Sequence, residues 1–187
     1  ILDFDNLTEE NIYVLDSPIL TNSQFKKFKK FFSKKIKVID CTFDIQNSLK
    51  DRIETIREEA ETAVREGSTC IVLSDKNFSS EKASIPSILT VGAVHSHLVK
   101  HGLRGYCSLN VECSDAMDTH SFAILIGVGA TTVNPYLAID SIYQRFEKKL
   151  FGKSDFETCV GKFKKSIDAG LLKIMSKMGI SVISSYR

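Results

Sequence analysis

The fold of this chain is decided by residues 86–111, PSILTVGAVHSHLVKHGLRGYCSLNV. Residues 86–101 carry apolar side chains at helical spacing, with Pro86 suited to the first turn of a helix and Gly102 placed just after its last turn. Residues 107–111 form a short run that is typical of a β-strand. The stretch therefore predicts an amphipathic helix, a glycine and a short strand.

The same unit recurs along the chain. Helix 49–66 precedes Gly67 and strand 69–73, and helix 120–126 precedes Gly127, Gly129 and strand 130–133. The last unit is helix 163–178, Gly179 and strand 180–184. An earlier strand, 36–40, follows helix 23–33. Helices that alternate with short strands predict a parallel sheet joined by right-handed crossovers. We expect an α/β fold whose five strands form an open doubly wound sheet or part of a barrel, with a partial or barrel-related (β/α) fold favoured. The charged residues 144–161 predict helical connections at the surface.

Length and charge set limits on the class of protein. The 187 residues fit a single domain, 1–187, in which we expect residues 1–12 to form an extended tail. The 25 basic and 23 acidic residues leave a net charge of +2, which gives no reason to expect binding to nucleic acid or to an anionic membrane. No apolar run reaches the roughly 18 residues that span a bilayer, and the N-terminus lacks a signal peptide's features. These features predict a soluble, cytoplasmic protein.

The cysteines and histidines do not predict a metal site. Five scattered cysteines without a C-x-x-C pair are typical of buried, reduced thiols. His95 and His97 fall within a predicted helix and point to nearly opposite sides, with His95 expected to pack and hydrogen bond. His97 and His101 share a helix face at i and i+4. Because no carboxylate or cysteine lies at a compatible spacing, a solvated pair is favoured over a zinc site.

Polar residues follow the predicted strands and form a candidate site. In parallel α/β folds the carboxyl ends of the strands meet at one edge, where function usually lies. Asp75, Glu112 and Asn134 would form a polar ring there. A catalytic interpretation makes Asp75 and Glu112 a carboxylate pair with Lys76 or Arg187 as an anion clamp. The structural interpretation, in which these groups hydrogen bond to loops or contact another domain, is favoured because polar strand ends occur wherever loops begin.

Several ordered stretches carry a family resemblance. Residues 170–187, GLLKIMSKMGISVISSYR, resemble a signature of the large chain of glutamate synthase, and four further stretches resemble the same family in the same order: SPIL at 17–20, IVLSD at 71–75, IPSILTVGAVHSHLVKHGLR at 85–104 and FAILIGVGATTVNPYLA at 122–138. The resemblance covers about residues 13–187 and implies the central domain, between the N-terminal glutaminase domain and the FMN domain. Because strand 180–184 would end the chain without its expected neighbours, we also expect a piece of a longer polypeptide.

The resemblance implies a function that belongs to the parent enzyme. Glutamate synthases make glutamate from glutamine and 2-oxoglutarate, using FMN, an iron–sulfur cluster and electrons from NADPH, NADH or ferredoxin, with a small reductase subunit or ferredoxin as a partner. The family's catalytic cysteine, FMN-binding and cluster-binding motifs do not occur in these residues. The resemblance therefore implies a linker domain that contributes to the ammonia tunnel wall, without catalytic, cofactor or metal residues of its own, in the cytoplasm or, in plants and algae, in a plastid.

Two further expectations follow. The polar face of the last helix, together with the C-terminal residues, is a candidate contact with the neighbouring glutaminase or FMN domain: Lys173, Ser176, Lys177, Tyr186 and Arg187. The alternative to a linker domain is a free-standing barrel-type lyase or phosphate-binding enzyme that uses Asp75, Glu112 and Lys76. A chain without a P-loop or nucleophile motif does not favour that alternative.

Overall fold

The computed structural model describes residues 13–186 and has an α/β fold. Its central sheet has four parallel strands in the order β1-β3-β5-β6. The strands are β1 (Ile36–Asp40), β3 (Cys70–Ser74), β5 (Ser108–Glu112) and β6 (Thr132–Asn134). Their spatial order follows their order in the chain, as in a barrel, and does not reverse at a switch point as in a doubly wound sheet.

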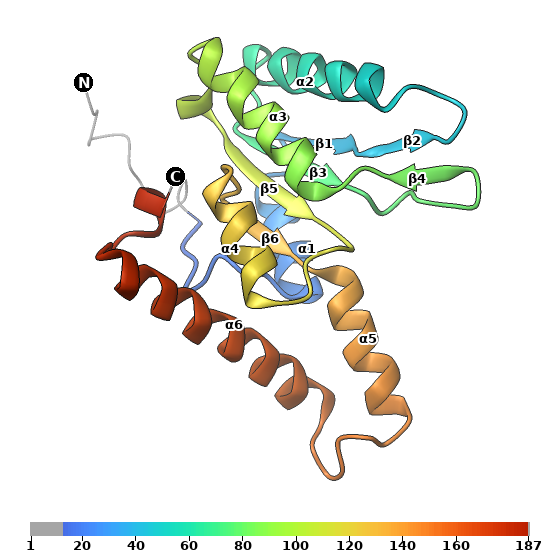
Figure 1. Cartoon of the computed structure of the whole chain (residues 1–187), viewed down its shortest axis with the longest axis vertical. Coiled ribbons are helices and arrows are strands. Elements are labelled where there is room, and N and C mark those ends of the chain that lie inside the picture. Colours follow the sequence, from blue (N-terminus) through green and yellow to red (C-terminus); the bar gives the residue numbers. More distant parts are fainter. Residues whose placement is uncertain (1–12, 187) are drawn as a thin grey trace.

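Three helices cover one face of this sheet. They are α2 (Leu49–Arg65), α3 (Ser87–Lys100) and α4 (Thr119–Gly127), and each joins two neighbouring strands. Because right-handed crossovers that always advance in one direction place their helices on one side, all three lie over the same face (Figure 1). The large core forms here around alternate strand residues, among them Ile71, Leu73, Leu109 and Val111.

The opposite face is covered by α1 (Asn22–Phe31), which Figure 1 shows behind the sheet. Thr21 begins this helix with a capping box completed by Gln24. Phe25 and Phe28 pack there against the intervening β3 residues, Cys70 and Val72, in a second cluster. All five residues of β3 are therefore buried, which explains the continuous apolar run of this strand.

The edge of the sheet beside β6 is occupied by residues 18–20. Ile19 forms a parallel bridge with Val133, the amide of Leu20 donates to the Val133 carbonyl at 2.9 Å, and the amide of Val133 donates to the Pro18 carbonyl at 2.8 Å. These residues therefore take the position of a further strand.

A second, two-stranded sheet lies beside the first. Strand β2 (Thr42–Asp44) pairs antiparallel with β4 (Lys82–Ser84), with Thr42 opposite Ser84. These three-residue strands were not predicted, because such short polar segments carry no periodic pattern. A single 3₁₀ turn, η3 (Arg104–Tyr106), precedes β5.

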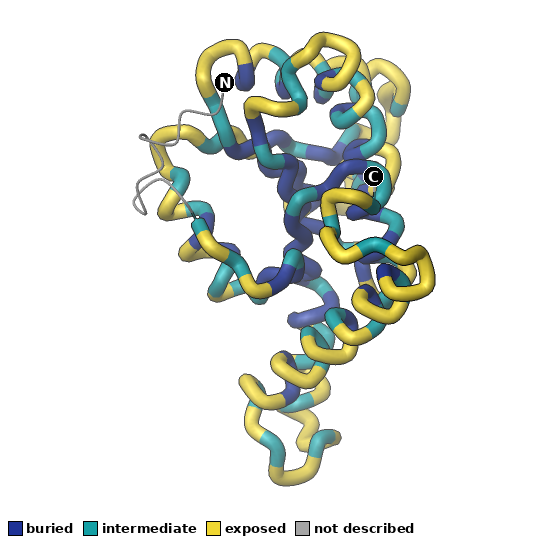
Figure 2. Tube along the Cα trace, turned by 90° about the vertical axis from the view of Figure 1, so that its left-hand side faces the viewer, coloured by how far each residue is buried: buried dark blue, intermediate teal, exposed yellow. Residues whose placement is uncertain are grey.

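Two helices follow the sheet, α5 (Tyr136–Glu147) and α6 (Phe156–Met178). Residues 144–161 are helical or looped, as predicted, but α6 begins at Phe156 rather than at residue 163. Asp155 is its N-cap, and its carboxylate accepts from the Thr158 amide at 2.7 Å. The connection between the two helices is exposed, whereas buried residues surround the sheet (Figure 2).

The predicted strand 180–184 is wrong. After Gly179, whose φ of 70° ends α6 as expected, the chain bends and forms the 3₁₀ helix η4 (Ile183–Tyr186). A strand needs a partner, and the nearer edge of the sheet is already occupied by Ile19. Instead, Ile183 and Tyr186 pack back on the core, with the Tyr186 ring so close to Gly127 that a Cβ there would lie 2.9 Å from it.

Several smaller predictions can be compared with residues 13–186. The five cysteines are free and buried, as predicted. His95 accepts a hydrogen bond from Arg104 at 3.0 Å, as expected for a packed histidine. The predicted tail, residues 1–12, lies outside the described residues. Within the described chain no helix is both long enough and apolar enough to cross a membrane.

Candidate functional site

The predicted polar ring lies where the parallel strands end, but its members do not form one cluster. Ser74, Glu112 and Asn134 are direct neighbours across β3, β5 and β6 in the register of the sheet, so their side chains share one face. This is the face that α1 covers. Asp75 follows Ser74 in the chain and binds different partners.

Glu112 is the buried centre of the ring, with 4% of its surface exposed. Its Oε2 accepts from Ser74 Oγ at 2.8 Å, and its Oε1 accepts from Lys29 Nζ and Lys76 Nζ, both at 3.2 Å. Burial by itself would raise the pKa of Glu112, but the Ser74 hydrogen bond and the two lysines outweigh burial and leave the pKa below its ordinary value. Glu112 is therefore an ionised anchor for α1 and the β3 loop.

Asp75 is also buried and is directed toward the loop after β5. Its Oδ2 accepts from the Ser114 amide at 2.9 Å and from Ser114 Oγ at 2.6 Å. Burial, followed by the nearby Asp75 carboxylate, raises the pKa of Tyr136 well above its usual range. Among the described residues, Asp75 Oδ1 and Tyr136 Oη have no hydrogen-bond partner of good geometry. Asp75 holds this loop in place and does not pair with Glu112.

Asn134 fixes the segment that leads into α1. Its Nδ2 donates to the Leu20 carbonyl at 2.9 Å and to Asn22 Oδ1 at 3.0 Å. One layer below, Thr132 Oγ1 donates to Asn110 Oδ1 at 2.8 Å, and both residues are buried, so the α1 side of β5 and β6 is polar. The side-chain amide of Asn134 satisfies the Leu20 carbonyl, next to the last backbone hydrogen bond of this edge, from the Leu20 amide to Val133.

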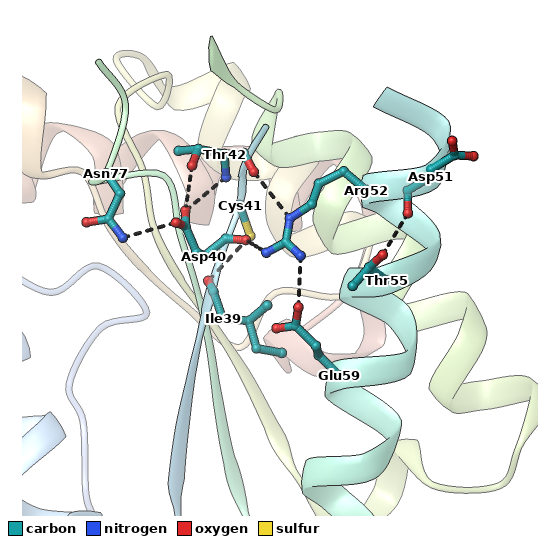
Figure 3. A network of polar contacts seen from close by, with 9 residues as sticks. All are labelled: Ile39, Asp40, Cys41, Thr42, Asp51, Arg52, Thr55, Glu59 and Asn77. Atoms are coloured by element: carbon teal, nitrogen blue, oxygen red, sulfur yellow. Dashed lines mark hydrogen bonds and ion pairs between the residues drawn. The ribbon is translucent and has the colours of Figure 1, made fainter. Parts of the chain in front are cut away.

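A second polar network, centred on Arg52, lies at the end of β1. In Figure 3, Arg52 extends from α2 to the strand end and donates to the Asp40 carbonyl at 2.5 Å, to the Thr42 carbonyl at 3.2 Å and to Glu59 Oε1 at 2.8 Å. Asp40 Oδ1 accepts from the amide and hydroxyl of Thr42. Sequence reasoning missed Arg52 because an arginine within a charged helix resembles any solvated residue.

This geometry favours a structural role for the strand ends. Glu112 and Lys76, two residues of the predicted catalytic set, form an ion pair with each other, and Asp75 binds Ser114. Arg187, the other predicted anion clamp, lies outside the described residues. Two carboxyl groups that act as general acid and base must both reach the same substrate, and these two are directed at groups of the chain itself, Asp75 at Ser114 and Glu112 at Ser74 and the lysines.

The predicted contact face on α6 is exposed. Lys173, Ser176 and Lys177 are all exposed, and the same helix leaves two apolar side chains in solvent, Leu172 at 64% and Met178 at 56% exposure. Tyr186 is only half-buried and lies against α4. The α6 contact face, defined as Leu172, Lys173, Ser176 and Lys177, therefore combines an apolar group with basic groups, whereas Met178 lies on the side of the helix that carries Leu171 and Met175.

Comparison with known proteins identifies relatives over the whole chain. Residues 2–187 match the glutamate synthase central domain family. The chain is 48% identical to a glutamate synthase (NADPH) large chain of Azospirillum brasilense over 100% of its length, and 40% identical to that of Bacillus subtilis (strain 168) over 92%. It is 39% identical to a ferredoxin-dependent glutamate synthase of Pyropia yezoensis over 92%. The chain spans only 11–12% of the length of these relatives.

The fold also resembles a solved barrel-like structure. A DHODH of Eimeria tenella, solved in complex with ferulenol, superposes with a TM-score of 0.52 over 81% of this chain and 36% of that one. At 14% identity the likeness concerns the fold alone. It confirms the prediction of a barrel-related α/β fold. Together with the match over residues 2–187, these observations show that the chain belongs to the glutamate synthase central domain family.

Proposed function

We propose that residues 1–187 form the connecting domain of a glutamate synthase, between a glutaminase domain and an FMN domain. The parent enzyme would make glutamate from glutamine and 2-oxoglutarate, with FMN, an iron–sulfur cluster and electrons from NADPH, NADH or ferredoxin. A small reductase subunit or ferredoxin would then be its partner, in the cytoplasm or in a plastid. The family match and the glutamate synthase names of the relatives support this proposal.

The main support for a non-catalytic role is that the polar groups at the strand ends already bind other residues of the chain. Glu112 accepts from three donors and Asn134 donates to two acceptors, all within the chain. In barrel enzymes the same edge presents polar groups to a substrate. Here Glu112 and Asn134 hold α1 and its entry segment over that edge, which supports a structural domain rather than a lyase or phosphate-binding enzyme.

The α6 contact face is where we propose that a neighbouring domain docks. Single exposed charges contribute only about 0–1 kcal/mol to the stability of a domain, so two lysines beside exposed Leu172 add little within the chain. Against another domain, the Leu172 side chain would be buried and the lysines would lie at the rim. Docking there would help to align the ammonia tunnel, because misplacing a reacting group by about 1 Å can reduce a rate about a hundredfold.

The test is the Lys173→Ala/Lys177→Ala double variant in the full-length enzyme, with glutamine hydrolysis and glutamate formation measured separately. Docking predicts that glutamine consumption exceeds reductive glutamate formation, because ammonia escapes at a misaligned junction. The matched control is Lys26→Ala/Lys27→Ala, which removes two exposed lysines from α1. Unchanged stoichiometry and rates in the α6 variant, or the same loss in the α1 control, would reject the proposed docking face.

A further inference from the structure

A cluster of one carboxylate and two imidazoles lies between α2 and α3. Glu61 of α2, His97 of α3 and His101, the C-cap of α3, each offer a ligand atom, and these three atoms lie within 4.8 Å of one another. His97 Nε2 lies 2.6 Å from Glu61 Oε2, and His101 Nδ1 lies 3.9 Å from the same oxygen. Tetrahedral zinc with bonds of about 2.0–2.1 Å places its ligand atoms roughly 3.4 Å apart, between these two separations.

The two histidines have the spacing of a helical chelate. Residues at i and i+4 lie one above the other on a helix face, and the two rings are 4.3 Å apart between centroids. Histidine pairs at this spacing bind zinc in helical His-x-x-x-His motifs. The third ligand was hidden from sequence analysis because Glu61 lies 36 residues before His97. His97 is therefore not the solvated residue that the sequence predicted.

Arg65 orients the carboxylate from outside the cluster. It binds Glu61 Oε1 through Nε at 2.8 Å and leaves Oε2 directed at the histidines. A second group that fixes the geometry of a ligand in this way is typical of metal sites.

The histidines can exchange their present contacts for an ion. His97 Nδ1 is buried and has no hydrogen-bond partner among the described residues. No contact at Nδ1 therefore holds the ring proton on the other nitrogen, Nε2, and the proton can move so that Nε2 binds an ion. His101 Nδ1 lies 2.8 Å from the His97 carbonyl at the open end of the cluster, where the side chain is 34% exposed. Rotation of this ring would direct a nitrogen lone pair toward a position between Glu61 Oε2 and His97 Nε2, where an ion could bind.

We propose that Glu61, His97 and His101 form a binding site for a transition-metal ion of the Zn²⁺ type that joins α2 to α3. Two imidazoles and one carboxylate suit Zn²⁺, Co²⁺, Ni²⁺ and Cu²⁺, whereas Mg²⁺ and Ca²⁺ require oxygen ligands. The positive charge of Arg65 lies close to the ion and weakens its binding. This site is independent of the proposed docking function, because it lies on other helices and needs no neighbouring domain.

The probes are Zn²⁺ and Co²⁺, titrated into the full 187-residue chain near pH 7.5 under reducing conditions. We expect one equivalent of Zn²⁺ by calorimetry, a higher Tm with Zn²⁺ and not with Mg²⁺, and the visible absorption of tetrahedral Co²⁺ without a thiolate-to-metal band. His101→Ala should weaken Zn²⁺ binding at least about tenfold, and Glu61→Gln should do the same while retaining the shape of the side chain.

The matched control is His120→Ala, which removes an exposed histidine outside the cluster, on α4. It should leave the affinity for Zn²⁺ unchanged. Circular dichroism of each variant without metal checks that it is folded, and because His101 is at the surface, its replacement should not change the spectrum. The proposal is overturned if the wild-type chain binds no Zn²⁺, if His101→Ala and Glu61→Gln bind it as tightly as the wild type, or if the Co²⁺ spectrum shows cysteine ligation.

Discussion

Lys29 and Glu112 are 83 residues apart in the sequence, and the ammonium group of Lys29 lies 3.2 Å from the Glu112 carboxylate. This pair joins α1, which covers one face of the sheet, to the end of β5 within the sheet. Glu112 is buried, whereas 34% of the Lys29 side chain is exposed. The carboxylate is thus desolvated and depends on its partners, while the lysine keeps partial contact with water.

Glu112→Gln should destabilise the chain by about 1–3 kcal/mol, because a neutral amide loses the charge-assisted hydrogen bonds to Lys29 and Lys76. Urea denaturation measures the change. The matched control is Glu54→Gln, which neutralises a carboxylate whose side chain is 50% exposed in its pair with Arg57. This control should change stability by less than about 1 kcal/mol, and equal losses in both variants would contradict the anchoring role of Glu112.

The same carboxylate predicts a pH dependence of stability. The pKa of Glu112 is lower in the folded chain than its ordinary value of 4.5, so the folded state binds this proton less readily than the unfolded state. Its contribution is complete above about pH 4.5 and is lost as the pH falls through the lowered folded value. The difference in stability between wild type and Glu112→Gln should therefore narrow from pH 6 to about pH 3. A difference that stays constant or widens on acidification would argue against the lowered pKa.

Arg52→Ala should cost about 1–3 kcal/mol, because it leaves the carbonyls of Asp40 and Thr42 without the guanidinium donor. Arg52→Lys should recover only part of this loss, because a single ammonium group cannot donate to both carbonyls in the way that the planar guanidinium group does. The control is Arg57→Ala on the same helix, because Arg57 forms an ion pair with Glu54, whose side chain is 50% exposed. Chemical denaturation of the three variants measures their free energies of unfolding. A loss of stability in Arg57→Ala as large as that in Arg52→Ala would contradict the role given to Arg52.

The thiols of the folded chain should react slowly. Burial raises the pKa of Cys41 to about 12 and that of Cys70 to about 11, so very little of the nucleophilic thiolate is present near pH 8. Ellman's reagent should modify the native chain slowly and the denatured chain rapidly at all five cysteines. Rapid modification of several thiols under native conditions would show that the core around them opens readily.

The sequence was sufficient to predict an α/β fold with a parallel sheet. The helix and strand 86–111 appear as α3 and β5, because the apolar period, Pro86 and Gly102 all favour the same structure. The prediction of a strand at 180–184 was wrong because periodicity shows an apolar pattern but not whether a neighbouring strand is available for pairing. Ile19 already occupies the nearer edge of the sheet. No local pattern shows that residues 18–20 lie beside Val133, more than a hundred positions later.

The sequence predicted where the strand-end polar residues lie, but not which residues they contact. The carboxyl ends of parallel strands meet by topology, so Glu112 and Asn134 could be placed at one edge from their strands alone. Lys29, Ser74 and Glu61 could not be assigned as partners, because each comes from a separate element and side-chain geometry decides the pairing. Contacts of this kind, between residues tens of positions apart, require the packed structure.

The central claim is that this chain connects two catalytic domains and has no catalytic site of its own. The most direct measurement is to mix the purified 187-residue chain with FMN and, separately, with glutamine, and to quantify bound flavin and released ammonia. A connecting domain of this kind should show neither stoichiometric flavin binding nor glutamine hydrolysis above the buffer rate. One equivalent of bound flavin, or glutamine turnover that persists through further purification and is lost in Glu112→Gln, would contradict it.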